Sequence, residues 1–226
     1  MSLKIEKIHA LCFDIDGTLN DTDDQFVLRL VHLLQPVAFL FPDRDPRRFA
    51  RQFVMKTENP GNYLFGLPDR LGIDDEISAL GDFLYRKGLG KTPKPFTIIP
   101  GVFEMLESLY ARYPLSIVSA RGARTTQMFL EQFDLQPFFQ CIATAQTCRH
   151  TKPFPDPILW AADRMGVPAE ACLMIGDTTV DILAGKASGA QTVGVLCGFG
   201  EEAELRQAGA DLILDATPQL VDVLLG

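Results

Sequence analysis

The chain has 226 residues, of which 47% are hydrophobic and 22% are charged, and its net charge is −8. This composition is typical of an ordinary globular protein with a sizeable core, and it argues against extended disorder. The acidic balance produces an overall field that repels nucleic acid and anionic membrane surfaces, so we expect neither of them as a partner.

Short apolar runs that end in polar or glycine-bearing turns predict buried strands. In chain order they are Ile8–Phe13, Leu115–Ser119, Cys141–Ala145, Ala171–Ile175, Thr192–Leu196 and Leu212–Leu214. Amphipathic segments of helical period lie between the later runs, at Val102–Tyr113, Ala123–Phe133, Pro157–Met165, Val180–Ser188 and Glu201–Gln207. The alternation predicts an α/β fold, with a three-layer Rossmann-like parallel sheet core whose ligands bind at the carboxyl ends of the strands.

The region from about Asp21 to Pro95 interrupts this alternation, because it contains helical patterns and a turn but no strand pattern. The helical patterns lie at Gln25–Leu34, Arg47–Lys56 and Glu76–Lys87, and the turn lies at Asn59–Gly66. A connection of this length is an inserted domain rather than a loop. We therefore expect a discontinuous catalytic core of residues 1–20 and 97–226 and an α-helical cap domain of residues 21–96. The prolines of Thr92–Pro95 and Ile99–Gly101 indicate the return hinge.

The cysteines give no sign of an oxidising compartment. The chain has five cysteines, and they are scattered without a CxxC spacing, which argues against a disulfide framework and a zinc site. The run Ile8–Phe13 includes His9 and is stopped by Asp14, so it does not resemble a signal peptide. No apolar stretch approaches the ~18 residues of a membrane span. We expect a cytoplasmic enzyme, and the sequence gives no information on oligomeric state.

Two carboxylates, Asp14 and Asp16, directly follow the first predicted strand and precede Gly17 and Thr18. Charges at the end of a buried strand carry a desolvation penalty, so they usually indicate chemistry. Three interpretations are open: solvated acids of a surface turn, a Mg²⁺ site, or a nucleophile (Asp14) with a proton donor and base (Asp16). The first fits the end of a buried strand poorly, and the spacing alone slightly favours the second.

Two further acids follow a later strand. Asp177 lies at the tip of the run that ends at Ile175, and Asp181 lies four residues on, at the start of a helix and on the same face. A helix cap, worth ~1 kcal/mol, is the structural alternative for Asp177 or Thr178. Because a cap accounts for one acid only, the pair favours a site.

Ser119, Lys152 and two backbone amides complete the set. Lys152 lies in a loop with three prolines, which hold the lysine in place, although an isolated lysine is more often a solvated surface residue. Ser119 ends a strand, and the amides of Ala120 and Arg121 can bind an oxyanion as a backbone nest. Together with the four acids and the Thr18 hydroxyl, these groups suit phosphoryl transfer assisted by Mg²⁺.

The ordered motifs resemble those of the haloacid dehalogenase superfamily, and within it the phosphoglycolate phosphatase-like enzymes with an inserted helical cap. The matching segments are Asp14–Thr18, Ser119 after a hydrophobic strand, Lys152–Pro153, and Gly176–Asp177 with Asp181. The resemblance extends over the whole chain and is most specific in the core.

The resemblance implies a role for each matching residue. Asp14 would be the nucleophile, Asp16 the acid and base, and Lys152 the group that stabilises the nucleophile and the phosphate. Thr18 and Ser119 would bind phosphate. Mg²⁺ would be held by Asp14, by the carbonyl of Asp16 and by Asp177, with Asp181 near the metal. An acid at position 16 indicates phosphate esters, because dehalogenases of this superfamily lack it and phosphonatases replace it.

The implied activity is Mg²⁺-dependent hydrolysis of a small phosphorylated metabolite through an aspartyl-phosphate, with a phosphoglycolate-like substrate as one option. A phosphomutase of the same fold, similar to β-phosphoglucomutase, is the first alternative, and an inactive phosphate-binding module is the second. An inactive module should have lost one of the core residues, and none is lost. Candidate groups for substrate selection are Arg47, Arg48, Arg51, Lys56, Arg70, Asn59, Asn62 and Tyr63 in the insert, and Arg121 and Arg124 in the core.

Overall fold

The computed structural model describes residues 3–21, 31–41, 46, 49–50 and 96–226. The chain divides into two compact units, one formed by Met1–Asp21 with Phe96–Gly226 and the other by Thr22–Pro95. Each division lies one residue from the boundary expected from the sequence. Most of the second unit lies outside the described residues, so its role as a cap stays a prediction. The predicted turn and the predicted helix Glu76–Lys87 lie wholly outside them, and the predicted helices Gln25–Leu34 and Arg47–Lys56 lie mostly outside them. Within it, residues 31–34 are helical and the 3₁₀ helix η2 spans Gln35–Leu40.

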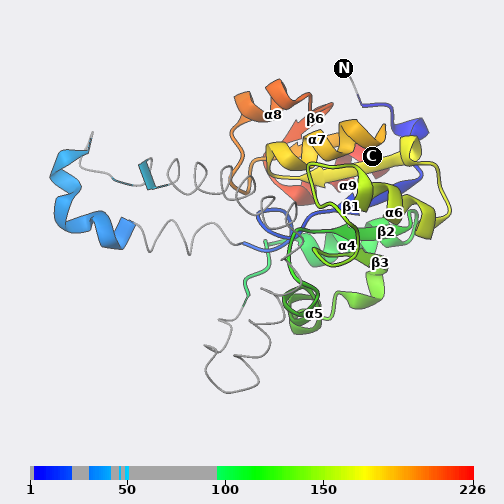
Figure 1. Cartoon of the computed structure of the whole chain (residues 1–226), viewed down its shortest axis with the longest axis horizontal. Helices are drawn as coiled ribbons and strands as arrows, with labels where there is room; N and C mark the ends of the chain where they lie inside the picture. The colour runs from blue at the N-terminus through cyan, green and yellow to red at the C-terminus, as the bar shows by residue number, and fades with distance from the viewer. Residues whose placement is uncertain (1–2, 22–30, 42–45, 47–48, 51–95) are drawn as a thin grey trace. The chain divides into compact units, whose positions relative to one another are not determined.

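The first unit contains a six-stranded sheet in the order β3-β2-β1-β4-β5-β6, in which every neighbouring pair is parallel (Figure 1). The strands are β1 (Ala10–Phe13), β2 (Leu115–Val118), β3 (Phe139–Ala143), β4 (Cys172–Gly176), β5 (Gln191–Val195) and β6 (Leu212–Leu214). The predicted parallel α/β sheet is confirmed. The largest shift is in β3, which begins two residues earlier than expected because Phe139 is buried whereas the next residue, Gln140, is exposed and hides the pattern.

The central strand β1 is buried on both faces. Leu11 and Phe13 belong to one hydrophobic core, and Ala10 and Cys12 belong to the other. A strand covered on both sides reads as a continuous apolar run, which is why the sequence identifies β1 so clearly. The residues that follow β1 therefore begin at the middle of the carboxyl edge of the sheet.

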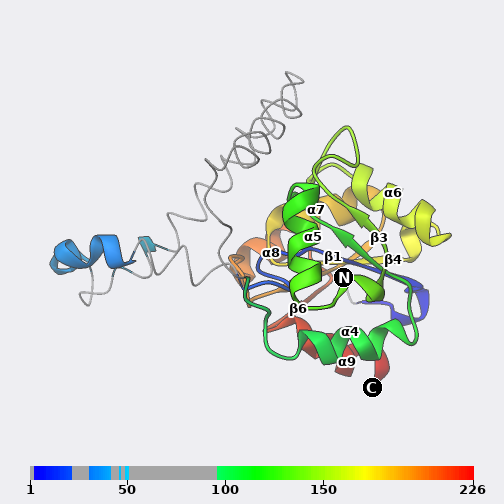
Figure 2. The ribbon, with the colours of Figure 1, turned by 90° about the horizontal axis from the view of Figure 1, so that it is seen from below.

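Helices cover both faces of the sheet, with α4 and α9 on one side and α6 and α7 on the other (Figure 2). The α-helices of this unit are α4 (Val102–Tyr110), α5 (Ala123–Gln132), α6 (Asp156–Met165), α7 (Thr179–Ser188), α8 (Glu202–Ala208) and α9 (Leu220–Leu225). Short 3₁₀ helices are η1 (Ile5–Lys7), η4 (Gln136–Phe138), η5 (Ala169–Ala171) and η6 (Thr217–Gln219). Within the described residues, no helix has the length and apolar character needed to span a bilayer.

Two details of the helices differ from expectation. Helix α4 ends at Tyr110 instead of Tyr113, because residues 111–113 turn towards β2. Helix α9 was not predicted, since its six residues are too few to display a helical period. Its Leu220 and Leu224 are buried in the same core as α4.

Helix α7 lies unusually close to the sheet, and this proximity depends on Gly185. A Cβ atom at this position would lie 2.4 Å from the Cγ2 of Thr192 and 3.1 Å from the Cβ of Met174. The missing side chain thus lets the helix pack directly on β4 and β5. Because α7 also carries Asp181, the same contact sets the distance of that carboxylate from the end of β4.

We expect Gly185→Ala to lower the free energy of unfolding by about 1–3 kcal/mol, because overpacking against Thr192 outweighs the better helix propensity of alanine. Denaturant titration measures the change. The matched control is Gly122→Ala, where the nearest atom would lie 3.5 Å from the new Cβ, and we expect a change within about 0.5 kcal/mol. Equal stability of the two variants would contradict the close-packing argument.

Candidate active site

The predicted site residues meet at the carboxyl edge of three neighbouring strands. In the sheet register Phe13 of β1 pairs with Ile117 of β2 and with Ile175 of β4, so the three strands end at nearly the same level. Asp14 directly follows β1, and its backbone N–H donates to the carbonyl of Ile175 at 2.9 Å. Residues far apart in sequence are thereby brought to one place.

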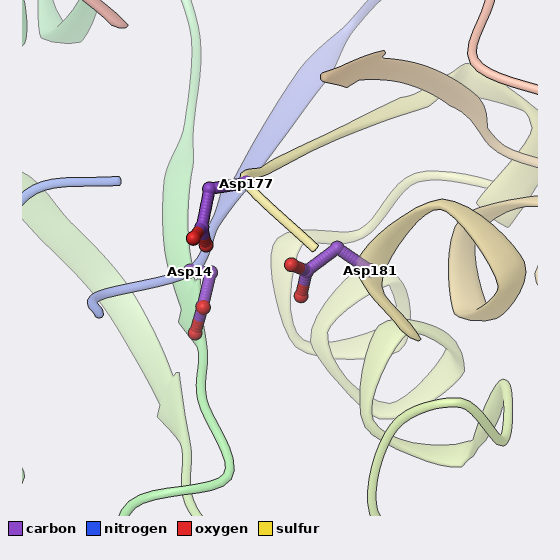
Figure 3. A group of neighbouring side chains, drawn as sticks. All are labelled: Asp14, Asp177 and Asp181. Carbon is purple, nitrogen blue, oxygen red and sulfur yellow. The ribbon is translucent and has the colours of Figure 1, made fainter. Parts of the chain in front are cut away.

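Three carboxylates form the centre of this edge. Asp14, Asp177 and Asp181 each place an oxygen within 4.8 Å of the others, and all three residues are buried. Figure 3 shows them gathered together, with Asp14 and Asp177 at the ends of adjacent strands and Asp181 at the start of α7. The convergence expected from the sequence is present for these three acids.

Lys152 bridges two of these carboxylates. Its Nζ lies 2.8 Å from Oδ1 of Asp14 and 2.6 Å from Oδ1 of Asp181, and its side chain is almost fully buried. Burial disfavours the ammonium ion, but the two carboxylates outweigh this effect and hold the pKa of Lys152 above its usual range. The lysine therefore stays charged inside the site.

The carboxyl group of Asp14 is in an unfavourable environment for a charge. Burial raises its pKa, the Lys152 ammonium opposes this, and the negative charges of Asp181 and Asp16 raise it further, to about 7. The buried cluster of Asp14, Asp177 and Asp181 thus has one ammonium beside it, that of Lys152, which contacts two of the three carboxylates. The arrangement has an excess of negative charge that a cation would compensate, and carboxylate oxygens are the ligands that Mg²⁺ prefers.

Asp177 occupies a space that two glycines leave open. A Cβ atom on Gly17 or on Gly198 would lie 2.2 Å from its Oδ2. Gly17 also has a φ of +70°, so this position needs glycine for its backbone as well as for space. The N–H of Phe199 donates to Oδ2 of Asp177 at 2.8 Å, and the hydroxyl of Thr18 donates to Oδ1 at 3.4 Å. The amide of Phe199 was not predicted as a site group, although its Gly-Phe-Gly turn is visible in the sequence.

Asp181 serves both the helix and the site. Its Oδ2 accepts hydrogen bonds from the backbone N–H and the hydroxyl of Thr178, at 3.0 and 2.7 Å, while its Oδ1 faces Lys152. The helix-capping role considered for Asp177 or Thr178 thus involves Asp181 together with Thr178. Capping leaves one oxygen of Asp181 in the acidic cluster.

Asp16 has different partners from Asp14. Its two carboxylate oxygens accept hydrogen bonds from Nε and Nη2 of Arg121, and Asn20 Nδ2 lies 3.4 Å from Oδ1. The Asp16 carboxylate is not one of the three clustered around Lys152. This ion pair was not predicted from the sequence.

The region after β2 differs in detail from the expected oxyanion nest. The hydroxyl of Ser119 accepts a hydrogen bond from the backbone N–H of Arg121 at 3.2 Å, so that amide already has a partner. Ala120 is exposed. The guanidinium carbon of Arg121 lies 5.0 Å from the centre of the Phe96 ring, which holds the side chain beside Asp16. Ser119, Ala120 and Arg121 therefore lie at the predicted edge, and their phosphate-binding roles stay predictions.

Comparison with known proteins gives a consistent family assignment. The family model described as haloacid dehalogenase-like hydrolase matches residues 11–195. Pyrophosphatase PpaX of Bacillus velezensis is 30% identical over 84% of this chain and 84% of its own length. The protein named "Probable phosphatase IndB" of Dickeya dadantii is 28% identical over 92% of this chain and 90% of its own.

Solved structures agree with the fold. A haloacid dehalogenase-like family hydrolase of Streptococcus pneumoniae has a TM-score of 0.66 and 23% identity, covering 96% of this chain and 99% of its own. A hydrolase of Deinococcus radiodurans, solved with bound phosphate and sodium, has a TM-score of 0.65 and 22% identity, covering 96% and 95%. The chain belongs to the haloacid dehalogenase-like hydrolase family and is therefore an enzyme of the hydrolase class.

Proposed function

We propose that the protein is a Mg²⁺-dependent phosphatase that hydrolyses a small-molecule phosphate monoester through an aspartyl-phosphate intermediate. The observation that carries the proposal is the buried Lys152, which contacts Asp14 and Asp181 while Asp177 completes the carboxylate cluster. The names of the relatives, which include a phosphatase and pyrophosphatases, support the same reaction class. Small phosphorylated metabolites are the proposed substrates.

The residues present suit a magnesium ion. Asp14, Asp177 and Asp181 offer hard oxygen ligands in a buried group with too little positive charge, and the carbonyl of Asp16 is a further proposed ligand. A bound Mg²⁺ would neutralise carboxylate and phosphate charge at this edge. It would also favour the ionised form of Asp14, which a nucleophile needs.

The side chains can carry out two displacements. In the first, a carboxylate oxygen of Asp14 attacks phosphorus, the bond from phosphorus to the ester oxygen breaks, and the carboxyl group of Asp16 gives its proton to the leaving alkoxide. In the second, the Asp16 carboxylate takes a proton from water, the water oxygen attacks phosphorus, and the bond from phosphorus to the Asp14 oxygen breaks. Inorganic phosphate leaves, and both carboxyl groups return to their starting forms.

Charge stabilisation during both steps falls to the fixed polar groups. Lys152 is held by two carboxylates and is aimed at Asp14, so it can stabilise negative charge on a phosphoryl group bound there. The hydroxyls of Thr18 and Ser119 are proposed phosphate ligands. Thr18 is fully buried beside Asp177, and Ser119 lies at the end of the neighbouring strand β2.

The first expected result concerns activity. Asp14→Asn should lower turnover of every phosphate ester by at least ~10³-fold, because the amide cannot form the phosphoryl bond. The measurement is phosphate release from a broad panel of esters and from pyrophosphate, with and without a chelator. Activity near the wild-type level in the variant would overturn the proposed mechanism.

Two controls belong to that panel. Chelator should abolish wild-type activity and added Mg²⁺ should restore it, whereas undiminished activity in chelator would contradict the metal requirement. Product analysis with a sugar phosphate separates the two reaction types, since a phosphatase releases inorganic phosphate and a mutase returns an isomeric sugar phosphate.

The second expected result concerns stability and pH. In metal-free wild-type protein the pKa of Asp14 is raised from 3.8 to about 7, so the folded state binds more protons than the unfolded state between these values. The contribution of Asp14 to the free energy of unfolding therefore falls as pH rises from about 4 to about 7. Asparagine does not titrate, so Asp14→Asn lacks this pH-dependent loss of stability. From pH 4 to pH 7 the free energy of unfolding of Asp14→Asn relative to that of the wild type should therefore increase by up to about 4 kcal/mol.

Denaturant titration in chelator, repeated across the pH series, tests this expectation. Saturating Mg²⁺ should stabilise the wild type more than Asp14→Asn and should reduce the pH dependence of the wild type. A stability difference that stays constant from pH 4 to 7 would show that the charge on Asp14 does not burden the folded protein.

A further inference from the structure

The ion pair between Arg121 and Asp16 connects the loops that follow two adjacent strands. Nε and Nη2 of Arg121 each donate to a different carboxylate oxygen of Asp16. The Arg121 side chain is 16% exposed and the Asp16 side chain is 32% exposed, so the pair is partly buried and only partly screened by water. Stacking on Phe96 further fixes the guanidinium group.

The pair holds Asp16 in a position that does not suit its proposed role. A proton donor must reach the ester oxygen next to the phosphoryl group, within about 2.6–3.2 Å. In this structure both oxygens of Asp16 are bound to Arg121, and the carboxylate lies outside the cluster formed by Asp14, Asp177 and Asp181. Asp16 must therefore leave Arg121, at least in part, before it can act on a substrate.

Leaving Arg121 without a replacement is costly, because a partly buried guanidinium would lose its counter-charge. A second anion removes this cost. Arginine binds carboxylates and phosphates through the same planar fork, so an anionic group of the substrate can take the place of Asp16. Nη1 of Arg121 is buried and has no hydrogen-bond partner among the described residues, which leaves a donor for such a group.

We propose that Arg121 determines substrate specificity by exchanging one anionic partner for another. In the resting enzyme its guanidinium holds the Asp16 carboxylate. When a substrate brings a second anionic group, that group binds the guanidinium and Asp16 becomes free to act on the substrate. The preferred substrates are then phosphate compounds with a carboxylate or second phosphate close to the transferred phosphoryl group. The inference rests on the proposed phosphatase function and adds the substrate class to it. Arg121 contacts the substrate in this scheme and acts on the chemistry through Asp16.

The test compares 2-phosphoglycolate with its carboxamide, which keeps the phosphate group but lacks the carboxylate charge. Inorganic pyrophosphate is a third substrate. Wild-type enzyme should favour the carboxylate over the amide by about 10- to 100-fold in kcat/KM. In Arg121→Ala this ratio should fall to about 1, while kcat for the amide should not fall, because Asp16 is no longer held. If Arg121→Ala also loses kcat/KM for pyrophosphate, Arg121 exchanges Asp16 for either a carboxylate or a phosphate. If kcat/KM for pyrophosphate is unchanged, the exchange is specific for a carboxylate.

Two variants serve as controls. Arg121→Lys keeps the charge without the fork, so it should give an intermediate ratio. Arg124→Ala tests the other core arginine named as a candidate for substrate selection, and exchange at Arg121 predicts that this variant keeps the wild-type ratio. Thermal unfolding of each variant verifies that it is folded.

Three outcomes would overturn the exchange. They are a wild-type ratio near 1, an equal loss of kcat for both glycolate substrates in Arg121→Ala, and a change of ratio that follows Arg124 instead of Arg121. The second would assign Arg121 a purely supporting role for Asp16. If Asp14→Asn is inactive while any of these occurs, the inference fails and the phosphatase function stands, whereas an active Asp14→Asn removes the function itself.

Discussion

The structure of the site depends on one interaction, the buried ammonium of Lys152 between the carboxylates of Asp14 and Asp181. Three acids within 4.8 Å of one another repel when ionised, and a single lysine compensates part of their charge. The sheet order, which places β1 beside β4, and the close packing of α7 both serve this arrangement. The remaining imbalance lowers stability, and a cation bound among the carboxylates would compensate it.

The two acids of the Asp14–Thr18 segment owe their different surroundings to the residue between them. Ile15 is fully buried and belongs to the same hydrophobic core as Phe13. Its carbonyl accepts hydrogen bonds from the N–H groups of Leu19 and Asn20, at 2.9 and 2.8 Å, which closes a compact turn. With Ile15 held in the core, Asp14 faces Lys152 and Asp16 faces Arg121. Local packing thus separates a proposed nucleophile from a proposed acid and base only two residues away.

The sequence predicts the parts of the site that follow from strand ends. Asp14 and Asp177 directly follow apolar runs, and parallel strands bring such positions to a common edge whatever their separation in the chain. The partnership of Arg121 with Asp16 could not be predicted in this way, because it depends on the reach of a flexible side chain between two loops. The contact of the Phe199 amide with Asp177 likewise depends on a turn from a third strand end. The insert residues that we named as candidates for substrate selection all lie outside the described part of the chain, so their roles stay predictions.

Asp16 is also tied to the segments through which the chain leaves and re-enters the core. Asn20 forms an antiparallel bridge with Ile98, and its side chain accepts from the N–H of Thr97 at 3.2 Å while its amide group lies 3.4 Å from Asp16. Asp21 donates to the carbonyl of Thr97 at 2.7 Å, so the two segments are paired. The 3.4 Å contact between the Asn20 amide and the Asp16 carboxylate is long for a hydrogen bond, whereas Arg121 contacts both carboxylate oxygens. Of these two side-chain contacts, the Arg121 pair is therefore the stronger restraint on the Asp16 carboxylate, and the proposed exchange acts on that restraint directly.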